Sequence, residues 1–298
     1  MLLTPRTRSV ALAVAVAVPL SRPPSFPVPS DAANLRAITS ASQVKLGDAD
    51  AARPRGLPHH KKLKDAADEQ VERIKDLQKV LYADGRFALL IVLQGRDASG
   101  KDGTVKKVFR GVNPMGCQVT SFKAPTEMEK RYDYLWRIHQ RVPALRMIGI
   151  FNRSHYEDVI VPRVHKLVKR KVLLERFDQI NDFELMLTQN SVVILKFFLH
   201  ISRDEQKKRL VERLEDRKKN WKFRAGDLDD RALWSDYTSA YREAIARCST
   251  TWARWFIVPA DDEDARDLLV ARKIADTLEA LDLRYPPLDP SLKGIKIR

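Results

Sequence analysis

The sequence predicts an α/β protein: a three-layer α/β/α sandwich whose mainly parallel sheet has about five strands. Three observations lead to this prediction. Short, solidly apolar runs alternate along the chain with stretches of helical periodicity. The first run leads directly into a glycine-rich loop and then into helix-favouring sequence. A later run, 147–151, ends in polar and charged residues, as strands of open parallel sheets do at the edge where ligands bind.

The first predicted element is an amphipathic helix that begins near residue 61. Val71, Ile74 and Leu81 recur at helical spacing, and Gly85 ends the pattern. The apolar run 89–93 follows. Because it has no polar face, it is expected to be a parallel strand covered on both sides.

The loop after this strand has the composition of a phosphate-binding P-loop. Gly95 and Gly100 let the backbone approach an anion, so that successive N–H groups can point inward while the next helix adds its dipole. Lys101 supplies a mobile positive charge for a phosphoryl group in transfer. Ser99 and Gly103 complete the expected phosphate-binding set. A plain turn is the alternative interpretation.

Two aspartates make this loop unusual. Asp102 stands where the G-x-x-x-x-G-K-[ST] pattern has a magnesium-binding hydroxyl, and Asp97 lies within the loop itself. Carboxylate oxygens are good ligands for a hard cation, so either aspartate can take over the task of the missing hydroxyl. The loop therefore predicts a site for phosphate and Mg²⁺, with Mn²⁺ as the alternative metal.

The remaining elements follow in the same alternation. After a helix that closes at Gly111, the apolar runs predict four more strands, at 117–122, 147–151, 192–199 and 255–258. Helical patterns predict a long helix from residue 203, another over 236–247 and a closing amphipathic helix over 263–281.

A second group of candidate residues follows the strand 147–151. Asn152 and Arg153 lie where a P-loop fold places residues that face the phosphates, and Arg153 is suited to neutralise charge as a phosphoryl group moves. Glu157 joins this group. It also completes a capping box with Ser154, and a role limited to the helix start is the alternative for it.

Several segments in order carry a family resemblance. They are GRDASGKDGT (95–104), FRGVNP (109–114), SFKAPT (121–126), FNRSHYED (151–158), INDFE (180–184), KNWKF (219–223) and VPAD (258–261). Together they resemble the family-2 polyphosphate kinases over nearly everything from residue 71 to residue 281. The resemblance implies a P-loop kinase-like fold. It also implies a Mg²⁺-dependent enzyme that moves a phosphoryl group directly, in line, between inorganic polyphosphate and a nucleoside mono- or diphosphate.

The resemblance also implies roles for single residues. Asp97 would bind metal or position the acceptor, Lys101 would hold the transferring phosphate and Arg153 would stabilise its charge. Three further residues would lie on the nucleotide and metal side: Asn152, Glu157 and Asp158, with Asp158 as a metal ligand. The form of the 151–158 segment resembles members that accept both mono- and diphosphates.

Two positions depart from the family's usual pattern. Arg96 replaces a small or apolar residue after the first loop glycine. The segment 263–266, Glu-Asp-Ala-Arg, replaces a Lys-Trp-Tyr type of sequence. These departures bear on the rate and on the acceptor preference.

The net charge of +15 predicts attraction to polyanions such as nucleic acid, anionic membrane or a phosphate polymer. Basic residues concentrate after the strand 192–199, where phosphotransferases of this fold carry a mobile lid, so we predict a lid around 203–235. The best candidates for polyphosphate binding are Arg209, Arg213, Lys219 and Lys222. A solvated surface is the alternative interpretation of this charge run.

The ends of the chain differ from the predicted phosphotransferase domain, 61–284. Residues 1–60 are expected to be a disordered or targeting extension, because Arg6 and Arg8 precede an apolar stretch too short to span a bilayer, as in a secretory signal. Nucleotide chemistry favours a cytoplasmic location instead, with export as the alternative. Residues 285–298 are expected to be a loose tail. The two cysteines, Cys117 and Cys248, exclude a disulfide framework.

The predicted partners are inorganic polyphosphate, ADP or AMP or guanine nucleotides, and further copies of the chain in a dimer or tetramer. No specific nucleic acid and no membrane span are expected. Two alternatives remain: a nucleotide kinase with ATP as donor, and a basic nucleic-acid-binding P-loop protein. The long cationic segment argues against the first, because a triphosphate does not need such a track, and salt-sensitive binding without turnover would indicate the second.

Overall fold

A parallel sheet of five strands in the order β2-β3-β1-β4-β5 lies at the centre of the computed structural model, which describes residues 35–223 and 226–297. The strands are β1 (Ala88–Gly95), β2 (Cys117–Ser121), β3 (Ile148–Asn152), β4 (Val192–His200) and β5 (Trp255–Pro259). Every pair of neighbouring strands is parallel. The predicted fold class is therefore confirmed.

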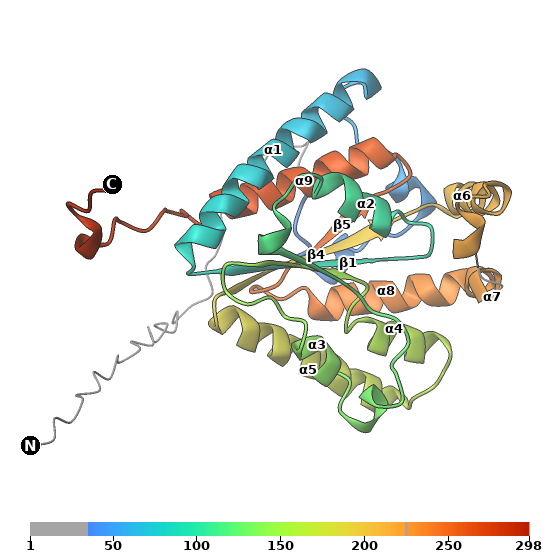
Figure 1. Cartoon of the computed structure of the whole chain (residues 1–298). Helices are drawn as coiled ribbons and strands as arrows, with labels where there is room; N and C mark the ends of the chain where they lie inside the picture. Colours follow the sequence, from blue (N-terminus) through green and yellow to red (C-terminus); the bar gives the residue numbers. More distant parts are fainter. Residues whose placement is uncertain (1–34, 224–225, 298) are drawn as a thin grey trace, which may run out of the picture.

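Helices cover both faces of this sheet (Figure 1). The helices are α1 (His60–Asp84), α2 (Lys101–Val108), α3 (Trp136–His139), α4 (Glu157–Val164), α5 (Arg170–Gln189), α6 (Arg203–Glu215), α7 (Gly226–Ala232), α8 (Trp234–Cys248) and α9 (Glu263–Glu279). One face packs against α1, α2 and α9, and the other against α4, α5 and α8. The helices α6 and α7 lie beyond one end of the sheet (Figure 1).

The central strand β1 explains why the core divides into two layers. All eight of its residues are buried. Successive side chains of a strand point to opposite faces, so Leu90 and Val92 pack in one cluster while Leu89 and Ile91 pack in the other. Each such side chain contributes about 1.5–3 kcal/mol when fully buried, and this rigid strand delivers the P-loop to the sheet edge.

The packed unit begins before the predicted boundary at residue 61. Leu35, Ile38, Val44 and Leu46 are buried in the two clusters that cover the sheet. The amide of Ile38 donates to the carbonyl of Trp255 on β5 at 2.9 Å. This segment could not be predicted, because its apolar residues have neither helical nor strand periodicity. Its regular structure consists of two short 3-10 helices, Ala41–Gln43 and Asp48–Ala51. The predicted signal-like stretch lies outside the described residues.

The predicted long helix from residue 203 is interrupted. Helix α6 ends at Glu215, a 3-10 turn covers Asn220–Lys222, and α7 then begins at Gly226. Residues 285–297 extend away from the sheet with exposed side chains (Figure 1). Within 35–223 and 226–297, no helix has the length and apolar character that a bilayer crossing requires.

Candidate active site

The P-loop follows β1 in a conformation that needs glycine at two points. Gly95 has φ +155°, and a Cβ there would lie 2.6 Å from the carbonyl oxygen of Leu199 and 2.6 Å from Ser99 Oγ. Gly100 has φ +97° and is the N-cap of α2. These two glycines let the chain turn tightly between the sheet and the amino end of α2, as a phosphate-binding loop requires.

The side chain of Lys101 is buried and folds back into the loop. Its Nζ donates to the carbonyl oxygens of Gly95 at 2.7 Å and Arg96 at 3.0 Å. Burial lowers the pKa of Lys101, and the negative charge of Asp97 opposes this shift. In this arrangement the loop carbonyls accept the hydrogen bonds of the ammonium group. A phosphate oxygen bound in the loop can compete with these carbonyls for the ammonium group.

Asp97 forms an ion pair across the loop with Arg153. Arg153 Nη2 lies 2.8 Å from Asp97 Oδ1. Burial alone would raise the pKa of Asp97, but the positive charges of Lys101 and Arg153 outweigh it, so this pKa lies below its ordinary value. Arg153 follows β3 with a φ of +63°, a conformation that is strained for a residue with a side chain. The predicted catalytic residues Asp97, Lys101 and Arg153 are thus brought together.

Other predicted residues connect the loop to β3 and α4. Asn152 Nδ2 donates to Asp102 Oδ1 at 2.7 Å. In the orientation that satisfies both ends of its amide, Gln94 donates to Glu157 Oε1 at 3.0 Å. Burial raises the pKa of Glu157. The Ser154 hydroxyl accepts from the amide of Tyr156, so Ser154 and Glu157 do not form the capping box considered from sequence.

A pocket lies between the P-loop, α4, α6, α7 and α8. The loop, the β3–α4 turn and α4 supply Gly95, Arg96, Asp97, Arg153, Glu157 and Val161. The helices on the other side supply Gln206, Asp227, Asp230, Tyr237 and Tyr241. Several residues of the first group are among the predicted site residues, but none of the second group is. Nothing in the local pattern of 226–241 indicates that this segment faces a loop more than a hundred residues earlier in the chain.

Arg96 also has a place that sequence reasoning missed. Its guanidinium carbon lies 3.8 Å from the centre of the Trp234 ring, and Nη2 donates to the Trp234 carbonyl at 2.9 Å and to the Thr238 hydroxyl. Burial lowers the pKa of Arg96 to about 10. The residue that departs from the family pattern therefore connects the P-loop to the start of α8.

Asp158 is not among the residues that line this pocket. Its Oδ2 lies 3.3 Å from Arg137 Nη2, and Arg176 donates to its main-chain carbonyl at 2.6 Å. Burial raises the pKa of Asp158. The structure thus separates the two predicted metal ligands: Asp97 lines the pocket and Asp158 belongs to a neighbouring ion pair. In the described part of the chain, no three His, Cys, Asp or Glu side chains lie close enough together to hold a metal ion.

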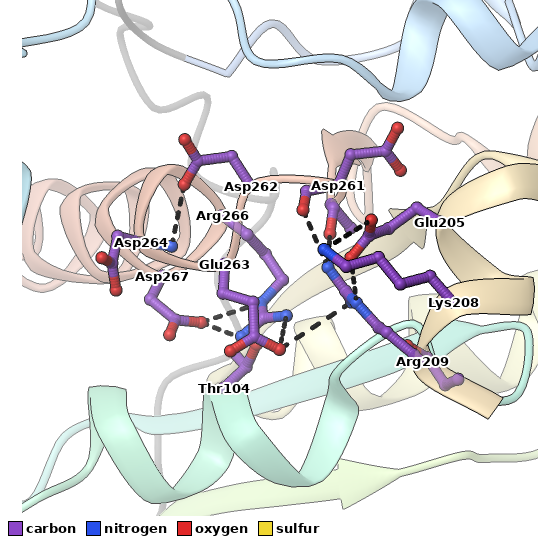
Figure 2. A network of polar contacts seen from close by, with 12 residues as sticks. Thr104, Glu205, Lys208, Arg209, Asp261, Asp262, Glu263, Asp264, Arg266 and Asp267 are labelled. Atoms are coloured by element: carbon purple, nitrogen blue, oxygen red, sulfur yellow. Dashed lines mark hydrogen bonds and ion pairs between the residues drawn. The ribbon is translucent and has the colours of Figure 1, made fainter. Parts of the chain in front are cut away.

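The predicted polyphosphate-binding cations have different environments. Arg209 donates from Nε to Glu205 at 2.8 Å and from Nη2 to the carbonyl of Asp261 at 2.9 Å (Figure 2). It also donates from Nη1 to the carbonyl of Ala98 at 3.1 Å and from Nη2 to the carbonyl of Ala260 at 2.8 Å. It therefore fastens α6 to the P-loop and is not an open cation.

The other three differ from Arg209. Arg213 Nη1 lies 3.3 Å from Asp227 Oδ2 beside the pocket. Lys219 is exposed, with Nζ 3.5 Å from Asp216 Oδ2. The side chain of Lys222 lies outside the part of the structure that is described.

The comparisons with known proteins agree with this geometry. The family model described as polyphosphate kinase 2 matches residues 57–286. The chain is 51% identical to an AMP/ADP-polyphosphate phosphotransferase of Meiothermus ruber over 225 residues, which cover 76% of this chain and 84% of that protein. It is 42% identical to an ADP-polyphosphate phosphotransferase of Rhodopseudomonas palustris over 234 residues, 74% of this chain and 81% of the relative.

A solved structure gives the same answer. The crystal structure of polyphosphate kinase 2 from Arthrobacter aurescens superposes with a TM-score of 0.76 at 39% identity, and the match covers 86% of this chain and 95% of that one. The family match spans more than half of the chain, and the resemblance stated from the sequence motifs is confirmed. The chain belongs to the polyphosphate kinase 2 family.

Proposed function

We propose that this protein transfers a phosphoryl group directly between inorganic polyphosphate and a nucleoside mono- or diphosphate. The family membership and the names of the two relatives support this function. The main supporting observation is that Asp97, Arg153 and Gly95 line one pocket at the end of β1. Transfer of this kind requires alignment and neutralisation of charge, which is what a P-loop, a lysine and an arginine provide.

The residues of the site divide this work. The amides of the loop and the amino end of α2 bind the phosphoryl group, and Lys101 exchanges its contacts with Gly95 and Arg96 for phosphate oxygens. Arg153 neutralises the charge that spreads over the equatorial oxygens during transfer. Asp97 holds the Arg153 guanidinium at 2.8 Å, so the arginine keeps its direction before the substrate arrives.

We infer that Mg²⁺ would be held by Asp97 and Glu157, in place of the predicted pair Asp97 and Asp158. Both carboxylates line the same pocket, and the Gln94 amide orients Glu157. Two protein carboxylates suit an ion that keeps several waters and phosphate oxygens in its octahedral shell. The bound ion would reduce the negative charge of the phosphates. Mn²⁺ accepts similar oxygen ligands.

We infer that the acceptors are both AMP and ADP, as in the name of the Meiothermus ruber relative. Guanine nucleotides are the next acceptors to test. We place the reaction in the cytoplasm, where nucleotides are kept, and expect the protein to assemble as a dimer or tetramer.

The test is a turnover assay with purified protein, polyphosphate, Mg²⁺ and each of AMP, ADP, GMP and GDP. We expect ADP from AMP and ATP from ADP, and loss of both activities in Lys101→Ala while the circular dichroism spectrum is retained. Retained activity in Lys101→Ala would overturn the assignment. Turnover of AMP with ATP but not with polyphosphate would indicate an ordinary nucleotide kinase instead.

A further inference from the structure

A buried group of polar side chains lies directly behind the turn that carries Arg153. Glu184 of α5 is its centre and is fully buried. Its Oε1 accepts from the Tyr156 hydroxyl at 2.9 Å and lies 3.1 Å from His155 Nε2. Its Oε2 lies 2.5 Å from Lys196 Nζ. His155, Tyr156, Glu184 and Lys196, called the Glu184 cluster below, each expose at most 1% of their surface.

The Glu184 cluster joins four elements. Lys196 stands in the middle of β4, and its Nζ also donates to the Tyr156 hydroxyl at 2.9 Å and to the carbonyl of Cys248 on α8 at 2.6 Å. Burial alone would raise the pKa of Glu184, but the positive charge of Lys196 keeps this pKa below its ordinary value. Glu184 and Lys196 together thus connect α5, β4 and α8 to the two residues that precede α4.

Those two residues follow Arg153 closely in the chain. Arg153 holds a φ of +63°, and a strained backbone of this kind persists only where its surroundings fix it. On its amino side, Asn152 pairs with Leu93 of β1, and the Arg153 amide donates to the Leu93 carbonyl at 3.0 Å. Downstream, His155 and Tyr156 are held by Glu184. The turn is therefore fixed on both sides of the strained residue, with Asn152, Arg153 and Glu157 directed away from this buried anchor and toward the P-loop.

We propose that the Glu184 cluster is a positioning device for phosphoryl transfer, in which Glu184 and Lys196 fix the β3–α4 turn and thereby the direction of the Arg153 guanidinium. The proposal rests on the proposed function, and none of these side chains lines the pocket. A buried ion pair is a weak source of stability, since apolar residues of similar volume replace it with little loss. Its function here is to hold one turn in one conformation.

The experiment separates stability from positioning. The double variant Glu184→Met/Lys196→Met removes both charges together, so that neither is left buried alone. Tyr156→Phe removes one hydroxyl from the cluster and keeps both charges. The matched control is Thr188→Val, one turn further along α5: Thr188 is buried, and among the described residues its hydroxyl donates within the helix, to the carbonyl of Leu185.

We expect the double variant to fold but to unfold at a lower denaturant concentration than the wild type, because Tyr156, His155 and the Cys248 carbonyl each lose a buried partner. Its kcat should be at least tenfold lower, with KM for both substrates within twofold. Tyr156→Phe should show a smaller fall in kcat, and Thr188→Val none. A stable double variant with wild-type kcat would overturn the proposal. If the double variant does not fold, wild-type kcat in Tyr156→Phe would overturn it.

A second measurement does not depend on activity. Hydrogen exchange of residues 152–157 should be faster in the double variant and in Tyr156→Phe, and unchanged in Thr188→Val. The two proposals can fail separately. If the wild-type protein does not use polyphosphate but the variants show this pattern of exchange, the proposed function is contradicted and the positioning role is supported. Unchanged exchange in both cluster variants would contradict the positioning role itself.

Discussion

The Arg153 guanidinium lies 2.8 Å from the Asp97 carboxylate, although 55 residues separate the two in the chain. Parallel pairing of β1 with β3 brings them together, because Leu93 lies opposite Asn152 and the residues that follow each strand meet at the same sheet edge. An arginine held in this way before substrate binds needs little reorganisation during transfer, which is the condition for effective electrostatic stabilisation.

The first prediction concerns this pair. Arg153→Ala should lower kcat by roughly 10²–10³, about 2.7–4 kcal/mol of transition-state stabilisation. Arg153→Lys should lose less, because it keeps the charge but not the planar fork that matches a phosphate. Steady-state assays with polyphosphate and ADP measure both effects. Arg141→Ala, at an exposed arginine, is the control, and an equal loss there would show that the effect is not specific to the site.

The second prediction concerns Gly100 and Arg266. Arg266 is fully buried, and a Cβ added at Gly100 would lie 1.9 Å from its Nη1. Its Nε lies 2.9 Å from Asp267 Oδ1 and its Nη1 forms an ion pair with Glu263 Oε1 at 3.6 Å (Figure 2), but neither Nη group has a hydrogen-bond partner within the described residues. Gly100→Ala should destabilise the protein both through this contact and through its φ of +97°.

The change Arg266→Ala should remove the steric contact with the added Cβ but not the backbone strain at Gly100. The cost of the double variant Gly100→Ala/Arg266→Ala should therefore be smaller than the sum of the single costs by about 0.5–3 kcal/mol, as for residues in direct contact. Urea unfolding of the four proteins in the cycle measures this coupling. Strict additivity would mean that the strained backbone at Gly100, and not the arginine, is the whole cause.

The third prediction concerns acid stability. Glu243 on α8 lies 3.1 Å from Arg163 Nη1 and 2.9 Å from Arg247 Nε, and it also contacts Arg170. Burial alone would raise its pKa, but the hydrogen bonds from Arg170 and Arg247 and the positive charge of Arg163 lower it from 4.5 to about 2. A carboxylate with a lowered pKa in the folded state stabilises the fold above its unfolded pKa, and this contribution is lost as pH falls from about 4.5 toward 2.

Glu243→Gln should therefore unfold with a free energy about 1–3 kcal/mol lower than the wild type at pH 7, a value discounted for the partial exposure of the group. The difference should narrow steadily below pH 4.5. Urea titrations at several pH values measure it. Glu175→Gln is the control, because Glu175 is exposed and lies 3.9 Å from Lys171. A gap that stays constant down to pH 3 would contradict the linkage.

The parts that could be predicted from sequence are those with a local signal. β1 and its loop were found because a fully apolar strand followed by Gly95, Gly100 and Lys101 has few other interpretations. Arg153 was found because it follows another such strand. The pocket wall from α7 and α8 could not be found, since Asp227 and Tyr237 reach the site only through the packing of distant helices.

Two further differences have the same cause. Asp158 adjoins Glu157 in the chain, yet successive helical residues point in different directions, and Asp158 meets Arg137 while Glu157 faces Gln94. Arg209 belongs to a basic run, but charge alone does not reveal that three main-chain carbonyls lie within reach of its guanidinium.

The last prediction separates two basic residues that the sequence grouped together, Arg209 and Lys219. Arg209→Met should lower the free energy of unfolding by about 1–3 kcal/mol, because the carbonyls of Ala98, Ala260 and Asp261 lose their donor. It should also lower kcat, since the P-loop loses a contact.

Lys219→Met should change stability by at most about 0.5 kcal/mol, as expected of an exposed side chain. It should instead raise KM for polyphosphate and weaken the dependence of KM on salt. Urea unfolding and polyphosphate titrations at two salt concentrations measure both sets of effects. If the two variants lose the same stability and change KM equally, Arg209 is not an anchor of α6 distinct from a cation open to the polymer.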